Sequence, residues 1–459
     1  MNVELVFGDD WINVTMPETT QIVKPGFSIP IEPVTDLEKA VGEALRNPLD
    51  AKPLSDLVKP DWKITIAFDD PTVPCYAPVW ETAISKILRE LKKVGVSESQ
   101  ITLLCANALH RKFRLPELET ILGAPIVQAF KDRIFCHDAE DPDGIVHLGE
   151  TSSGYDVEIN RRVVESNLTV YVNAVSTGFN GGWKSICVGL STWRSIRWHH
   201  TPEIMTMSLV RNPMHDILNE MGEIVKSIIG QEKIFKVETL LANPFEVARI
   251  WAGSVDATRR EALDLLKAHT PPRRQLLQEK ADIVCYGIPY WSPYAAFATM
   301  TPILTLISTG LGYLGGMIEA AGKPGCSVII ATPCPNQWDD IHHPTHREIW
   351  EHILAETLDP NEIMRRYADK FAKRADYIAK YRFEHAFHPV HGILALHPLK
   401  RLRNVNQVFI AGAQDPKLIQ RLGFTPTKTV EEAVNKAQAI HGKDAVVACV
   451  RYPMMVNRQ

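Results

Sequence analysis

Residues 168–185 of the chain read LTVYVNAVSTGFNGGWKS, and this stretch decides how the fold is interpreted. Its first part, LTVYV, is apolar and predicts a buried strand. Gly178, Gly181 and Gly182 follow and allow the backbone to approach a ligand closely. The segment after Ser185 is apolar and lacks proline, so it can begin a helix. The stretch therefore predicts a strand, a glycine loop and a helix in succession.

A glycine loop between a strand and a helix favours anion binding, because unpaired N–H groups and the helix dipole both point toward it. Lys184 would add a positive charge or a nucleophilic amine at that place. The loop does not match the phosphate-binding motif of nucleoside triphosphatases, although Lys184-Ser185 fit its end. Taken alone, the loop predicts a ligand site without identifying the ligand.

Bulk properties describe a soluble globular chain of more than one domain. It has 459 residues, of which 45% are hydrophobic and 23% are charged. The net charge of −4 and the lack of a basic block argue against nucleic acid or an anionic membrane as a partner. We see no signal peptide, and the eight cysteines form no CxxC motif. Reduced thiols in the cytoplasm are the expectation.

Strands and helices alternate along both halves. Residues 62–68 and 101–105 predict strands, and the apolar face of residues 80–91 predicts a helix between them. A second alternation begins at Ala281. We therefore predict an α/β protein with two domains, residues 1–272 and 273–459, each built on a mostly parallel sheet flanked by helices. The active site is expected in the interdomain cleft, since ligands gather where parallel strands end.

Two further strand ends carry polar residues. His110-Arg111 could be an acid/base with a carboxylate-binding fork, or a surface pair. Asp69-Asp70 could orient a cofactor or hold a metal, or could cap the next helix. Of the adjacent pair His199-His200, at most one is expected to bind a metal.

The remaining histidines and two long segments lead to separate expectations. His342 and His343 follow a predicted strand end. A second group recurs at a spacing of three and is interrupted by Pro389: His385, His388 and His391. Both groups could form a metal site or a substrate-facing loop. Residues 137–160 look irregular. Residues 294–318 are apolar but broken by proline and glycines, which favours buried helix and turn over a membrane span.

Several motifs together resemble one family over essentially the whole chain, the nickel-pincer nucleotide-dependent lactate racemases and their homologues. The motifs are Asp69-Asp70-x-Thr72, Leu109-His110-Arg111, His137-Asp138 with residues 148–154, the loop 178–184 with Val188-Gly189, His200, Asn212-Pro213-x-His215-Asp216, and Gly287-x-Pro289 with Tyr294. The combination is specific, whereas each motif alone would be weak.

The resemblance implies a cofactor and a reaction. The cofactor is the nickel-pincer nucleotide, nickel pyridinium-3,5-bisthiocarboxylic acid mononucleotide, which the family holds on a lysine that matches Lys184. The nickel ligand matches His200. The family transfers a hydride between a 2-hydroxy acid and this cofactor, while paired histidines, one matching His110, exchange the hydroxyl proton. The resemblance also assigns Asp70, Gly178, Asn180, Gly181 and Gly182 to cofactor binding, and Arg111 and Tyr294 to substrate binding.

Positions that the family uses for substrate are replaced here. The second histidine falls at Ala174, an arginine at Val73, and a glutamine and a lysine at Ala295 and Ala298. Loss of two carboxylate partners argues for a hydroxy acid larger than lactate, such as a sugar acid. His342 or His343 could supply the missing acid/base, with His385, His388 and His391 next.

The favoured function is therefore a nickel-dependent racemase or epimerase. Alternatives are net oxidoreductase or dehydratase chemistry with the same cofactor, a non-catalytic nucleotide-binding homologue, and a zinc or iron hydrolase built on the extra histidines. The expected partners are the hydroxy acid, the enzymes that synthesise and load the cofactor, and a second copy of the chain in a homodimer.

Overall fold

The computed structural model describes residues 1–26, 29–205, 212–270, 277, 279–455 and 458. They divide into two compact units. Unit 1 comprises Met1–Gly26, Pro271–Tyr377 and Pro389–Gln459, and unit 2 comprises Phe27–Thr270 and Ile378–His388. The boundary expected between residues 272 and 273 lies outside the described residues.

These units differ from the division 1–272 and 273–459 in two segments. Residues 1–26 belong to unit 1 because strand β3 (Thr20–Val23) pairs in parallel with β16 (Val447–Val450). Residues 378–388 belong to unit 2, where the Tyr381 hydroxyl accepts a hydrogen bond from the Ala139 N–H at 2.9 Å. Neither long-range pairing leaves a local signal in the sequence.

Unit 2 is built on a six-stranded sheet of order β11-β10-β9-β4-β5-β6. Its strands are β4 (Ile64–Asp69), β5 (Ile101–Ala106), β6 (Ile134–Cys136), β9 (Leu168–Val175), β10 (Ile234–Asn243) and β11 (Glu246–Gly253). All neighbours pair in parallel except β11, which pairs antiparallel with β10 at the edge. The predicted parallel α/β sheet is confirmed, and β10 and β11 are additions.

The strand order of unit 2 reverses between β4 and β9. The chain adds β5 and β6 on one side of β4, and then returns to place β9 and β10 on the other side. The crossover helices therefore diverge at the carboxyl ends of β4 and β9, which is where open α/β sheets bind ligands. Asp69-Asp70 follow β4 and the glycine loop follows β9, so both predicted ligand segments lie at this switch point.

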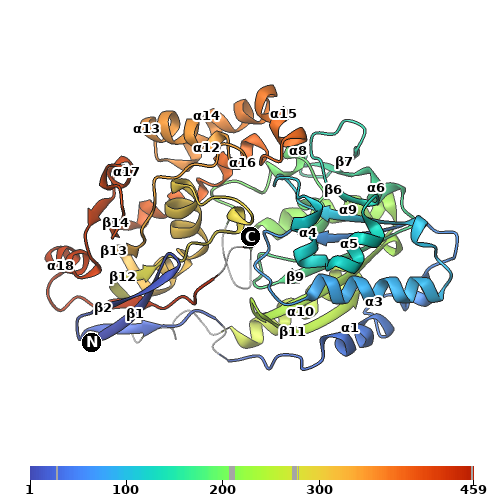
Figure 1. Cartoon of the computed structure of the whole chain (residues 1–459), viewed down its shortest axis with the longest axis horizontal. Helices are drawn as coiled ribbons and strands as arrows, with labels where there is room; N and C mark the ends of the chain where they lie inside the picture. Colours follow the sequence, from blue (N-terminus) through green and yellow to red (C-terminus); the bar gives the residue numbers. More distant parts are fainter. Residues whose placement is uncertain (27–28, 206–211, 271–276, 278, 456–457, 459) are drawn as a thin grey trace. The chain divides into compact units, whose positions relative to one another are not determined.

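Helices cover the sheet of unit 2 as the apolar periodicity indicates. They are α1 (Leu37–Arg46), α2 (Leu54–Leu57), α3 (Val79–Lys93), α4 (Leu115–Leu122), α5 (Ala124–Phe130), α6 (Arg161–Glu165), α7 (Lys184–Cys187), α8 (Trp193–Ile196), α9 (Met214–Ile229) and α10 (Val255–His269). Helix α3 buries Trp80, Ile84 and Leu91 and packs beside α1 (Figure 1). The Ser254 hydroxyl caps α10 by accepting the Ala257 N–H at 3.3 Å.

The expectation that residues 137–160 are irregular is wrong. They include an antiparallel hairpin of β7 (Ile145–Glu150) and β8 (Asp156–Asn160). Its turn closes through the Thr151 N–H to the Tyr155 carbonyl at 3.0 Å, and Gly154 adopts a φ of +80°. The turn-forming residues Ser152-Ser153-Gly154 connect the two strands.

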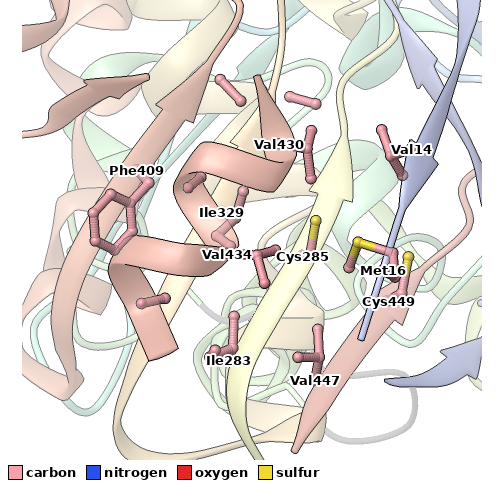
Figure 2. Packing of buried hydrophobic residues seen from close by; sticks show 14 of the residues in the cluster. Val14, Met16, Ile283, Cys285, Ile329, Phe409, Val430, Val434, Val447 and Cys449 are labelled. Atoms are coloured by element: carbon pink, nitrogen blue, oxygen red, sulfur yellow. The ribbon is translucent and has the colours of Figure 1, made fainter. Parts of the chain in front are cut away.

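Unit 1 has a second sheet, parallel throughout, of order β15-β14-β13-β12-β16-β3. The strands not yet defined are β12 (Ala281–Gly287), β13 (Gly322–Ala331), β14 (Val405–Ala411) and β15 (Thr425–Thr427), and a hairpin of β1 (Asn2–Phe7) and β2 (Asp10–Thr15) accompanies them. Val430 and Val434 of α18 (Val430–His441) pack onto Ile329 and Ile283 in the core (Figure 2). Hydrophobic burial of this kind stabilises the sheet.

The remaining helical segments also belong largely to unit 1. They are the 3-10 turn Pro293–Ala295, the π-helix Ile303–Tyr313, α11 (Gly316–Ala321), α12 (Thr345–Glu348), the π-helical turn Ile349–Ile353, α13 (Leu354–Glu356), α14 (Pro360–Ala372), α15 (Ala375–Phe383), α16 (Pro389–Leu394), the 3-10 segment His397–Asn404 and α17 (Pro416–Arg421). Among the described residues, Ile303–Ala321 alone has the length and apolar composition of a membrane span, and 72% of that window is buried inside the protein.

Candidate functional site

The glycine loop after β9 is shaped by two residues with positive φ. Gly181 has a φ of +83° and Gly182 a φ of +57°, a conformation that side chains with a Cβ rarely adopt. The guanidinium of Arg259, from α10, donates to the carbonyl of Gly178 at 2.6 Å and also to the carbonyl of Asn180. These bonds hold the loop that precedes Lys184, the first residue of α7.

Part of the predicted anion-binding backbone is already engaged by the protein. The Gly182 N–H donates to Glu238 Oε2 at 3.1 Å, and the N–H groups of Phe179 and Asn180 donate to Thr177. The N–H groups of Gly178 and Gly181 have no acceptor among the described residues. The donors that remain for an anion at this loop are therefore fewer than the glycine pattern indicates.

A buried ion pair lies beneath the loop. Lys236 and Glu238, both on β10, have completely buried side chains, with 3.6 Å between Lys236 Nζ and Glu238 Oε2. The Lys236 ammonium also donates to the Gly182 carbonyl at 3.3 Å and to the Ser185 hydroxyl. Burial lowers the pKa of Lys236 to about 8, against the opposing charge of Glu238. Sequence reasoning missed this pair because it did not predict β10.

Lys184 has the environment of a reactive amine. Lys184 is half-buried, and its Nζ lies 4.7 Å from the centre of the Phe179 ring. Burial lowers the pKa of Lys184, although the charges of Asp69 and Asp70 act in the opposite direction. A lowered pKa increases the neutral fraction of the amine, which is the nucleophilic form.

Asp69, the last residue of β4, accepts two hydrogen bonds from β9. Its Oδ1 accepts the Tyr171 hydroxyl at 3.0 Å, and its Oδ2 accepts the Ala174 N–H at 2.9 Å. Burial raises the pKa of Asp69 to about 6, although these two hydrogen bonds lower it. Asp69 therefore joins β4 to β9, and Ala174 is buried.

Asp70 and His110 form a carboxylate–imidazole pair. The distance from His110 Nδ1 to Asp70 Oδ2 is 2.7 Å, and Asp70 Oδ1 accepts the Thr72 N–H at 3.2 Å and the Thr72 hydroxyl at 2.5 Å. An ionised Asp70 can only accept, so His110 carries hydrogen on Nδ1 and presents Nε2 as a base. Phe387 lies beside this pair, with 5.7 Å between the ring centres of Phe387 and His110, and nothing in the sequence indicated it.

Arg111 does not have the role expected of it. Its guanidinium is completely buried and forms two hydrogen bonds to Glu117, at 3.0 and 2.9 Å, while stacking on Phe113 at 4.3 Å. The fork that would bind a substrate carboxylate is bound to a carboxylate of the protein. Arg111 therefore stabilises the segment after His110, and we do not propose it as a substrate ligand.

His199 and His200 follow α8 and contact each other. Their Nδ1 atoms are 2.8 Å apart, and both backbone N–H groups donate to the Ile196 carbonyl at the end of α8. Burial lowers the pKa of His199 to about 3, and the charge of Lys184 acts in the same direction. His199 is therefore neutral, and His200 is half-buried. No group of three His, Cys, Asp or Glu side chains within the described ranges has metal-binding geometry.

The other predicted histidines divide between the units. In unit 1, His342 Nδ1 lies 3.0 Å from Asp339 Oδ2, and His343 donates from Nε2 to the Tyr294 carbonyl at 2.8 Å. The ring centres of Tyr294 and His391 are 4.4 Å apart in the same unit.

His385 and His388 lie in unit 2, at 3.0 Å from the Lys112 carbonyl and 2.9 Å from Glu140 respectively. The regular spacing of His385, His388 and His391 therefore does not produce one helical face, since α16 begins only at Pro389.

Comparison with known proteins connects this arrangement to one family. Residues 7–209 match the lactate racemase N-terminal domain. The chain is 25% identical over 431 residues to the lactate racemase of Lactiplantibacillus plantarum, covering 90% of this chain and 89% of the relative. It is 23% identical, over 89% of this chain and 88% of the relative, to the lactate racemase of Thermoanaerobacterium thermosaccharolyticum.

Solved structures agree on the fold. The lactate racemase apoprotein from T. thermosaccharolyticum superposes with a TM-score of 0.68 at 20% identity, covering 100% of this chain and 99% of that chain. A Thermotoga maritima protein from a structural genomics programme gives a TM-score of 0.56 at 13% identity, covering 94% of this chain and 99% of that chain. The chain is thus similar to lactate racemases over most of its length, and residues 7–209 match the lactate racemase N-terminal domain.

Proposed function

We propose that this chain is a racemase or epimerase of a 2-hydroxy acid larger than lactate, and that it uses a nickel-pincer nucleotide attached to Lys184. The observation that carries the proposal is the arrangement at the switch point of unit 2. A half-buried lysine amine, the adjacent pair His199-His200 and the Asp70–His110 pair all belong to unit 2, in a chain that resembles lactate racemases.

The residues present fit the cofactor. The Lys184 amine has a lowered pKa and is suited to an amide-type bond with a thiocarboxylate arm. His200 offers an imidazole, and the N–H groups of Gly178 and Gly181 suit a phosphate. When bound, the cofactor would supply a reversible hydride acceptor.

The protein residues then account for the proton. His110, whose Nδ1–H is held by Asp70, has an Nε2 lone pair that can take the proton of a substrate hydroxyl. The Asp70 charge stabilises the imidazolium that results, and Thr72 fixes the carboxylate. This pair serves one face of the stereocentre only.

A second proton partner is needed if both configurations are made, and Ala174 cannot provide it. We propose His342 for this role, in preference to His343. The Nδ1 of His342 faces Asp339 Oδ2 at 3.0 Å, which repeats the Asp70–His110 pattern. The Asp339 carboxylate is held by the N–H groups of Thr299 and His342 at 2.9 and 2.8 Å. Although burial raises the pKa of Asp339, these bonds lower it, so the carboxylate is ionised.

The choice of substrate rests on the residues that are absent. Val73, Ala295 and Ala298 replace the arginine, glutamine and lysine that the family resemblance implies, and Arg111 is neutralised by Glu117. A small free carboxylate such as lactate would then have weak recognition. A larger hydroxy acid can bind through further hydroxyl groups.

The test is turnover with a panel of hydroxy acids deuterated at the alcohol carbon, using protein loaded by the cofactor-synthesis enzymes. We expect inversion of a sugar acid with deuterium retained in the product, because the hydride returns to carbon. Faster turnover of lactate would contradict the substrate assignment. Accumulation of a keto acid or an alkene without inversion would favour oxidoreduction or dehydration instead. Within the panel, His342→Ala should lose inversion and His343→Ala should retain most of it.

A further inference from the structure

One hydrogen bond joins the Nδ1 atoms of the adjacent histidines His199 and His200. Their Nδ1 atoms are 2.8 Å apart, and the ring planes make an angle of 64°. Two imidazole nitrogens can approach so closely only if one carries hydrogen and the other a lone pair. The tautomers of the two rings are therefore coupled, and each arrangement of one fixes the other.

Only one of the two arrangements suits a metal ligand. If His199 donates, His200 accepts at Nδ1 and carries its hydrogen on Nε2, where no metal can bind. If His200 donates, its Nε2 has the lone pair that a metal requires, and His199 carries hydrogen on its own Nε2. Metal-bound histidines ordinarily have their second nitrogen fixed by a hydrogen-bond acceptor in this way.

One nitrogen of the His199 ring has no hydrogen-bond partner among the described residues. The His199 side chain is completely buried, and its Nε2 has no hydrogen-bond partner among the described residues. Both backbone N–H groups of the pair are satisfied by the Ile196 carbonyl, so the backbone does not compete for the rings. A buried N–H without an acceptor is unfavourable, and buried polar atoms in proteins nearly always have a partner. If His199 carries hydrogen on Nε2, the described residues therefore provide no acceptor for it.

We propose that His199 is a positioning residue for the metal. It accepts the Nδ1–H of His200, which leaves the Nε2 lone pair of His200 for nickel, and its own Nε2–H donates to an oxygen or sulfur atom of the bound cofactor. The inference rests on the proposed function and assigns a task to a histidine that the resemblance leaves without one. Loading then fixes the tautomers of both rings, and His199 connects nickel retention to cofactor occupancy.

Substitutions of His199 separate this role from simple packing. In His199→Asn, the side-chain oxygen is bonded to the same carbon as Nδ1 was and can accept the His200 hydrogen. In His199→Leu, the ring is replaced by an apolar group that cannot accept. Each variant is produced with the cofactor-synthesis enzymes, and thermal unfolding establishes that it is folded. Intact mass then reports the adduct on Lys184, and nickel loss to a chelator is measured over time.

We expect all three proteins to carry the adduct. Nickel affinity should fall about 10–100-fold in His199→Leu, the range found for partners of metal ligands, and His199→Asn should recover most of it. Equal nickel retention in wild type and His199→Leu would overturn the inference while leaving the proposed function intact. Equal loss in both variants would also overturn it, because packing would then be the cause. A wild-type protein without adduct would overturn the proposed function, and the inference with it.

A measurement on wild-type protein keeps the proposal testable if neither variant folds. Nitrogen-15 NMR of the histidine-labelled, loaded protein distinguishes the two tautomers of His199. Hydrogen on Nε2 and a bare Nδ1 are expected. Hydrogen on Nδ1 of His199 would overturn the proposal.

Discussion

A methyl group added at Gly181 tests the geometry of the loop that precedes Lys184. A Cβ at this position would lie 2.4 Å from Glu238 Oε1 and 2.9 Å from Val175 Cγ2, and the φ of +83° is unfavourable for alanine. Gly154 provides a matched control in the same unit, since its φ is +80° but a Cβ there meets nothing within 4 Å. The difference between Gly181→Ala and Gly154→Ala therefore isolates the contact from the backbone strain.

The expected magnitudes follow from these contacts. The left-handed conformation costs both variants roughly 1–2 kcal/mol of unfolding free energy. Gly181→Ala must also displace the Glu238 carboxylate from the Gly182 N–H, which adds roughly 1.5–3 kcal/mol because the bond is buried and charge-assisted. For a unit of this size, that additional cost lowers the unfolding temperature by roughly 3–12 °C relative to Gly154→Ala.

Thermal unfolding of the cofactor-free protein, followed by circular dichroism and calorimetry, gives the comparison. Both substitutions lie in unit 2, so both should move the same transition. Equal unfolding temperatures for the two variants would refute the position of Glu238 beneath the loop. A larger loss in Gly154→Ala would refute it as well.

Three further predictions concern neighbouring groups. Glu117→Ala leaves the buried Arg111 guanidinium without its carboxylate and should cost about 3–5 kcal/mol of unfolding free energy in urea titrations, whereas Glu119→Ala on the same helix should change little. Asp70→Asn should lower kcat about 10²–10⁴-fold at nearly constant KM, because His110 loses the acceptor that fixes its tautomer, and an unchanged kcat would remove His110 as the base. Burial lowers the pKa of His137 to about 4, below the value of about 6.5 in an unfolded chain, so the unfolded state binds more protons between these pH values. The free energy of unfolding should therefore fall as the pH drops from 6.5 toward 4, whereas Asp69, with its pKa raised to about 6, acts in the opposite direction. His137→Asn should flatten the profile of unfolding free energy against pH.

The sequence predicted those parts of the fold that have a local period. The strands at residues 64–69, 101–106 and 168–175 and the helix at 79–93 show clear apolar patterns, and their polar ends indicated the switch point. Strand β10 was missed because Lys236 and Glu238 interrupt its apolar pattern, and only the fold reveals that they pair with each other.

The roles of the site residues stay predictions, and the structure describes only their surroundings. Burial lowers the pKa of Lys184, and His110 lies 2.7 Å from Asp70. Arg111 was wrongly interpreted, because a partner six residues later on a helix neutralises it, and spacing does not show which way a guanidinium turns. Phe387 and Arg259 approach the site from distant segments, and no sequence pattern connects them to it.

The central claim is that Lys184 carries the cofactor. Its most direct measurement is the intact mass of the chain, with nickel analysis, after production together with the cofactor-synthesis enzymes, for the wild type and for Lys184→Arg, which keeps the charge. We expect the mass of one cofactor and stoichiometric nickel in the wild type, and neither in the variant. An unmodified wild-type mass, or an adduct that persists in Lys184→Arg, would contradict it.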